Sequence, residues 1–240
     1  MEFVIGGVSA LMDARFAAAA GTERVVLHPW ISRPQSNRGI GFLPEAIGEL
    51  EGTPEEILKQ ALAVWNEIKG WVSGPEIWLA APWPYLPLAL EAFDAFDDCS
   101  GLMVNAAQSA AQSAAPLAMQ HPPIEIPSRL PYAVNYIPGT PGTPGVPGTS
   151  GAVGAPGIPG ITNAWTTQNP PDWVVIAPDS IMSLPLNFDT LRYLRVETLD
   201  EVMALQTRQD LPHFAGIYLQ ANAPEAATDY ELWQEIIDAC

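Results

Sequence analysis

Polar residues close or follow most of the short apolar runs in this sequence. They include a histidine, an arginine, acids and amides: His28, Asn105, Asp179, Arg195, Glu197, Gln220 and Asn222. Arg38 follows the second run. An acid, a cation and amide groups gathered at one edge of a sheet would suit an anionic small molecule, with arginine as a bidentate contact. The alternative is that these residues are polar only because strand ends meet water.

Other chemistries lack the residue spacing that they need. His28, His121 and His213 are isolated, so none forms the close pair typical of a zinc site. Neither Cys99 nor Cys240 has a paired histidine that would activate a thiolate. The sequence has no glycine-rich nucleotide-binding motif after a strand. We therefore expect no metal and no cofactor.

The chain is strongly acidic. Its 240 residues include 27 acidic and 10 basic ones, which gives a net charge of −17. Nucleic acids and anionic membrane surfaces both attract clustered Lys and Arg, so we expect neither as a partner. The N-terminus does not read as a signal peptide, and no uninterrupted run reaches the roughly 18 apolar residues of a membrane span. Two cysteines exclude a disulfide framework. We expect a cytoplasmic protein.

Strand-like runs alternate with helical patterns along the chain. The strand-like runs are residues 3–7, 23–28, 76–80, 101–105, 172–177, 191–196 and 214–219, with a weaker one at 123–126. Helical patterns cover residues 11–20, 53–69, 84–96, 106–119, 198–209 and 228–239. Repeated strand–helix units indicate parallel pairing. The sequence thus predicts an α/β fold, a (β/α)8 TIM-type barrel with its working face at the C-terminal ends of the strands. An open doubly wound sheet is the alternative.

A glycine repeat interrupts this rhythm between the fifth and sixth predicted strands. Eight glycines recur at every third position from Gly139 to Gly160, many of them preceded by proline. This is the collagen pattern, in which only glycine fits at the crowded axis. We divide the chain into a first part of the barrel (1–126), a polyproline-like excursion (127–168) and the remainder of the barrel (169–240). Residues 138–162 either pack on their own barrel, join copies into a homo-oligomer, or are disordered.

Several motifs occur in the order found in one family of barrel enzymes. Gly6, Asp13–Ala14, Gly21 and the Ser-Asn-Arg run 36–38 follow one another as in the first strand, helix and loop of phosphoribosylanthranilate isomerase. Residues 216–232 are similar to the last strand and final helix of that family. The chain therefore resembles a divergent phosphoribosylanthranilate isomerase. This resemblance implies a TIM-type barrel, and an Amadori rearrangement of a phosphoribosyl amine by a Cys base and an Asp acid.

The chain departs from that family at the positions of its catalytic and phosphate-binding residues. The resemblance places Ile5 at the position of the Cys base, and isoleucine transfers no proton. Asp179 is the position that would correspond to the acid. The glycine-rich phosphate-binding turns of the family are replaced here by residues 195–197 and 220–222. The residues left to bind an anionic substrate are Arg38, His28, Asn105, Arg195 and Asn222.

These departures predict a barrel without the isomerase activity that is used for binding or self-assembly. Two alternatives stay open. One is an isomerase or lyase that acts on an anionic sugar phosphate or carboxylate. The other is a structural appendage or filament subunit that assembles through the Gly-x-y segment.

Overall fold

The computed structural model describes residues 1–31, 50–105, 126–136, 170–176, 190–207, 214–221 and 228–240. The Gly-x-y repeat and the helix expected at 106–119 lie outside these ranges. No helix within them is long and apolar enough to cross a bilayer.

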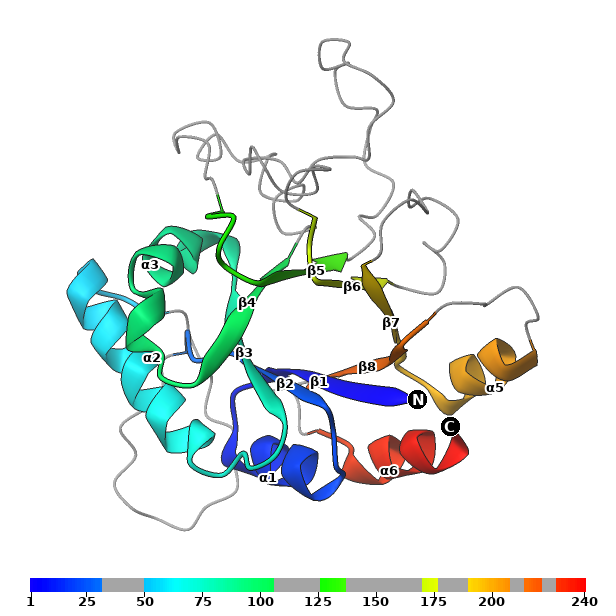
Figure 1. Cartoon of the computed structure of the whole chain (residues 1–240). Helices are drawn as coiled ribbons and strands as arrows, with labels where there is room; N and C mark the ends of the chain where they lie inside the picture. The colour runs from blue at the N-terminus through cyan, green and yellow to red at the C-terminus, as the bar shows by residue number, and fades with distance from the viewer. Residues whose placement is uncertain (32–49, 106–125, 137–169, 177–189, 208–213, 222–227) are drawn as a thin grey trace, which may run out of the picture.

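Eight parallel strands pair in sequence order and close into a barrel (Figure 1). They are β1 (Glu2–Val8), β2 (Arg24–Leu27), β3 (Glu76–Ala81), β4 (Cys99–Asn105), β5 (Tyr132–Tyr136), β6 (Trp173–Ile176), β7 (Leu191–Arg195) and β8 (Gly216–Gln220). The last strand pairs with the first, from Glu2 beside Gly216 to Gly6 beside Gln220. This closure confirms the TIM-type barrel and excludes the open sheet.

The fifth strand differs from the sequence prediction. It lies at Tyr132–Tyr136, not at residues 123–126; Ile126 belongs to no strand, and 123–125 fall outside the described ranges. Val134 at its centre pairs with Val104 of β4 and Val174 of β6. Proline has no N–H to donate to a ladder, which makes the Pro122–Pro123 region a poor strand. The barrel thus continues past the boundary predicted at residue 126, and the other segment boundaries remain predictions.

Five α-helices accompany the strands in the described part of the chain: α1 (Leu11–Ala19), α2 (Pro54–Lys69), α3 (Leu86–Glu91), α5 (Leu199–Thr207) and α6 (Tyr230–Ala239). Short 3₁₀ turns, η1 (Trp83–Tyr85) and η2 (Phe93–Ala95), flank α3, so the single helix expected over 84–96 is divided. The predicted start of α2 is confirmed. The Thr53 hydroxyl accepts a hydrogen bond from the Glu56 N–H, and the Glu56 carboxylate accepts one from the Thr53 N–H, which forms a capping box.

Two hydrophobic cores fill the molecule. The larger one lies between the strands and the helices and contains Ile5, Trp65 and Trp233. The smaller one fills the barrel with the opposite faces of the strands, and its largest members are aromatic. There the Trp173 ring meets Trp78 and Tyr193 edge-on, at centroid distances of 5.1 and 5.5 Å. Aromatic rings therefore take the interior volume that branched aliphatic side chains usually fill in such barrels.

A charged cluster closes the N-terminal end of the barrel. Arg24 forms ion pairs with Glu2 at 3.0 Å and with Glu76 at 2.9 Å. The Tyr193 hydroxyl donates to Glu2 and accepts from Arg24. The hydrogen bond from Tyr193 lowers the pKa of Glu2, while burial raises the pKa of Tyr193. These four side chains, Glu2, Arg24, Glu76 and Tyr193, are thus paired with one another.

Candidate functional site at the barrel mouth

Strands β7 and β8 bring Arg195 and Gln220 to the mouth of the barrel. Side chains alternate between the two faces of a strand, so Arg195 shares the inner face with Tyr193, and Gln220 shares it with Tyr218. Both tyrosines belong to the core inside the barrel. The guanidinium of Arg195 forms an ion pair with Glu197 at 2.9 Å. The sequence analysis named Arg195, Glu197 and Gln220, and the structure brings them together.

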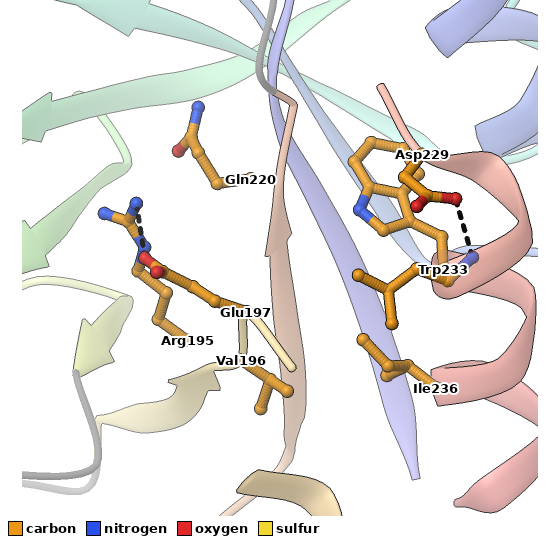
Figure 2. A pocket seen from close by; sticks show the side chains of 8 residues that line it. Arg195, Val196, Glu197, Gln220, Asp229, Trp233 and Ile236 are labelled. Atoms are coloured by element: carbon orange, nitrogen blue, oxygen red, sulfur yellow. Dashed lines mark hydrogen bonds and ion pairs between the residues drawn. The ribbon is translucent and has the colours of Figure 1, made fainter. Parts of the chain in front are cut away.

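These residues line a pocket of about 300 Å³ between the ends of β7 and β8 and the first turns of α6 (Figure 2). The other lining residues are Val196 after β7, the N-cap Asp229 of α6, and Leu232, Trp233 and Ile236 of that helix. The Asp229 carboxylate caps the helix by accepting a hydrogen bond from the Leu232 N–H at 3.0 Å. The pocket is therefore polar on its strand side and largely apolar on its helix side.

The charges of this pocket disfavour an anion. Its lining carries one guanidinium and two carboxylates, a net charge of −1. A helix N-terminus attracts anions through its free N–H groups, but the Asp229 carboxylate already accepts from one of them. Glu197 likewise holds the Arg195 side chain, which is 21% exposed. An incoming phosphate or carboxylate must displace Glu197 and approach Asp229.

One hydrogen-bond donor in the pocket lacks an acceptor among the described residues. The Nε of Arg195 is buried and has no hydrogen-bond partner among the described residues. A buried donor without an acceptor is costly, so it favours a ligand or water that supplies an oxygen.

Strand β1 brings no acid–base group to the mouth. Ile5 is fully buried in the core between strands and helices, so the position that the resemblance assigns to a base faces the helices. The neighbouring Gly6 lies against Tyr218, and a Cβ added at Gly6 would be 1.7 Å from the Tyr218 hydroxyl oxygen. That hydroxyl donates to the Gln220 Oε1 at 2.8 Å. Burial raises the pKa of Tyr218, which leaves a neutral hydroxyl in this space.

Of the other predicted site residues, the structure describes the side chain of His28 alone, and His28 does not line this pocket. His28 follows β2, and its backbone N–H donates to the Val8 carbonyl at 2.8 Å. Burial lowers the pKa of His28, so its imidazole is neutral near pH 7. Asn105 ends β4, but its side chain is outside the described part of the structure. Arg38, Asp179 and Asn222 lie outside the described ranges.

The sequence analysis missed one buried polar residue of the barrel. Asn135 of β5 is 3% exposed, and its Oδ1 has no hydrogen-bond partner among the described residues. It shares the inner face of β5 with Ala133, which lies in the core inside the barrel. No polar–apolar alternation in residues 132–136 could have located it, because this strand is buried on both faces.

The described residues offer little other chemistry. Burial raises the pKa of the Cys99 thiol to about 12, so a nucleophilic thiolate does not form there at neutral pH. Within the described ranges, no group of three His, Cys, Asp or Glu side chains is placed to hold a metal ion.

Solved structures share this architecture at low sequence identity. TrpF from Jonesia denitrificans matches with a TM-score of 0.50 and 12% identity, over 100% of this chain and 96% of that one. Phosphoribosyl anthranilate isomerase from Thermus thermophilus gives 0.44 and 15%, over 100% and 98%. Tryptophan synthase from M. tuberculosis in its aminoacrylate-bound form gives 0.48 and 12%, over 99% and 93%. No family model and no curated protein matches the chain.

The chain thus has a closed (β/α)8 barrel, a fold that it shares with TrpF from Jonesia denitrificans, and the fold implied by the resemblance of its motifs is confirmed. An identity of 12% carries the fold alone. Barrels of this fold host many unrelated activities.

Proposed function

We propose that this protein is a barrel scaffold without phosphoribosylanthranilate isomerase activity that works by binding and by self-assembly through its Gly-x-y segment. The observation that carries the loss of activity is the contact between Gly6 and Tyr218. An isomerase of this type needs a base at the mouth, and this end of β1 offers a glycine backed by a neutral tyrosine hydroxyl.

The pocket between β7, β8 and α6 supports the same proposal. Barrel enzymes commonly hold a substrate phosphate in this region, through the loops after the seventh and eighth strands and a helix N-terminus. Here Asp229 caps the helix and Glu197 pairs with Arg195. Two carboxylates stand where a phosphorylated substrate would place its charge, and like charges repel most strongly where water is partly excluded.

The sequence of the repeat supports the role in assembly. Residues 138–162 contain no Asp, Glu, Lys or Arg, whereas the whole chain has a net charge of −17. The segment belongs to the connection that leaves the C-terminal end of β5 and enters the N-terminal end of β6, and these two strands are parallel neighbours. A Gly- and Pro-rich segment without charge is suited to contact another molecule.

The activity half of the proposal is tested by a turnover assay with phosphoribosylanthranilate. The purified full chain should not accelerate the reaction above the rate without protein, whereas an active isomerase run in parallel should. General acid–base groups contribute about 10²- to 10⁴-fold each, so a working site would be obvious. Turnover by the full chain that falls on Tyr218→Phe substitution would overturn the proposal.

A second candidate function is binding or conversion of an anionic small molecule at the mouth. The buried Nε of Arg195, without a partner among the described residues, is the observation that favours it. Titration calorimetry with inorganic phosphate and with a dicarboxylate tests this candidate. Binding that is lost in Arg195→Ala would support it, and Arg38→Ala tests the contact proposed for the loop after β2. Absence of heat with both anions would rule out this candidate.

A further inference from the structure

An apolar face lies on the outside of the barrel, where α1 meets α6 and the end of α2. We call it the aromatic face and define it by Met12, Arg15, Phe16, Trp71 and Tyr230. Met12 and Trp71 are each 51% exposed, unusually high for such large apolar side chains. A shallow depression of about 360 Å³ is lined by four of these residues, Met12, Arg15, Phe16 and Tyr230. Its lining is mainly apolar, and Arg15 is the one charged side chain in it.

The rings of this face are held in place by their neighbours. Phe16 stacks on Tyr230, with ring centroids 5.3 Å apart and planes at 28°. The Tyr230 hydroxyl donates to the buried carboxylate of Asp13 at 2.7 Å. The Arg15 guanidinium lies over the Trp71 ring, 5.4 Å from its centroid. Rings fixed in this way lose little conformational freedom when a partner binds.

We propose that the aromatic face binds the Gly-x-y segment, residues 138–162, of a second copy of this chain. This inference rests on the proposed self-assembly and names the surface that receives the segment. Proline-rich segments in the polyproline conformation dock on grooves lined by aromatic rings, because the proline rings pack flat on them and little chain entropy is lost. The segment brings proline, valine, isoleucine and alanine and no charge, which matches an apolar face.

The barrel geometry favours a second copy over the same chain. Strands β5 and β6, whose connection contains the segment, lie across the barrel from α1 and α6 (Figure 1). A polyproline rod of this length extends roughly 70 Å, and a connection that must come back to the strand next to the one it left reaches only about half as far. To dock on its own face, the segment would have to run around half of the helix layer. A neighbouring molecule meets it directly.

This contact has a defined symmetry and salt dependence. A segment on one copy and a face on the next make a head-to-tail contact, so assembly proceeds to rings or open chains. A collagen triple helix would instead join three copies at one axis. Because each copy has a net charge of −17 and the contact itself is apolar, added salt should strengthen the association by screening repulsion between barrels.

Sedimentation equilibrium of full-length variants tests the inference. Met12→Gln and Trp71→Ala should each weaken self-association by about tenfold or more, as expected for the centre of an apolar contact. Met203→Gln is the matched control, because Met203 is a 52% exposed methionine on α5, outside the aromatic face. It should leave association unchanged. Circular dichroism verifies that every variant is folded.

The outcomes separate this inference from the proposed function. If deletion of 139–160 abolishes association while Met12→Gln and Trp71→Ala associate like the wild type, the segment assembles but the aromatic face does not receive it. A discrete trimer with the ellipticity of a triple helix would also overturn the inference. If the deletion leaves association unchanged, or the full chain stays monomeric, both the inference and the proposed self-assembly fail.

Discussion

The hydroxyl of Tyr218 occupies the space that a side chain at Gly6 would need. The two residues lie on the paired strands β1 and β8, and a Cβ on Gly6 would be 1.7 Å from the Tyr218 oxygen and 2.2 Å from the ring carbon that carries it. Glycine at position 6 and tyrosine at position 218 therefore depend on each other for packing. With Tyr218 in this space, position 6 cannot carry a side chain that acts as a base at the mouth.

Gly6→Ala should therefore destabilise the barrel by about 1–3 kcal/mol, because the added methyl group overpacks the interior. The cost should fall when Tyr218 is first replaced by Ala, since the space is then free. Urea denaturation of the two single variants and the double variant measures this coupling. Gly70→Ala is the control: its added Cβ meets only ordinary contacts, the nearest at 3.6 Å. Additive effects of Gly6→Ala and Tyr218→Ala would contradict the packing described here.

Glu197 should act as an internal competitor for anions. Its carboxylate pairs with Arg195 and is 63% exposed, so Glu197→Gln should change the free energy of unfolding by less than about 1 kcal/mol. The same change should increase the affinity of the pocket for inorganic phosphate, because Arg195 is released and one negative charge is removed. Titration calorimetry in low salt measures the affinity. Equal phosphate affinity of the wild type and Glu197→Gln would show that Glu197 does not compete with anions for Arg195.

The buried Asp13 carboxylate should destabilise the folded state as the pH rises, whereas an ion-paired carboxylate stabilises it. Burial raises its pKa above the ordinary value of 3.8, so the folded state holds this proton more tightly than the unfolded state. The destabilisation by the Asp13 carboxylate is fully present above the folded-state pKa and is relieved as the pH falls through it. The stability of Asp13→Asn relative to the wild type should therefore be greatest near pH 7 and decline on acidification.

Urea midpoints of both proteins between pH 3.5 and 7 measure that difference. Asp94→Asn, a change at an exposed position, serves as the control for general charge effects. Asp13→Ala, which removes the acceptor of the Tyr230 hydroxyl, should instead cost about 1–3 kcal/mol. A relative stability of Asp13→Asn that is constant with pH would contradict this reading of Asp13.

Local signals in the sequence located most of the fold. The start of α2 is indicated by three residues, Thr53, Pro54 and Glu56. Thr53 and Glu56 accept hydrogen bonds from free N–H groups of the first turn, and Pro54 has no N–H that would need a partner. Asp229 likewise indicates the start of α6. The fifth strand was harder, because a strand buried on both faces lacks a clean alternation of polar and apolar residues. Only its pairing with β4 and β6 identifies Tyr132–Tyr136 as a strand.

The site was less predictable because it depends on which face each residue presents. Arg195 and Gln220 could be named from their places at strand ends. The resemblance placed Ile5 at the position of the Cys base, yet Ile5 faces the helices, and a shift of one residue along a strand moves a side chain to the other face. The contributions of Tyr218 and Trp233 are tertiary: their rings reach the mouth region only through packing, which no local pattern encodes.

The central claim, a folded barrel that assembles through residues 139–160, is tested most directly by sedimentation equilibrium of the full chain and of a chain lacking those residues. The account predicts that the full chain self-associates and that the shortened chain is a folded monomer, because β5 and β6 already pair and shortening the connection between them costs little entropy. Circular dichroism checks the fold of both. A shortened chain that fails to fold, or one that associates as strongly as the full chain, would contradict the account.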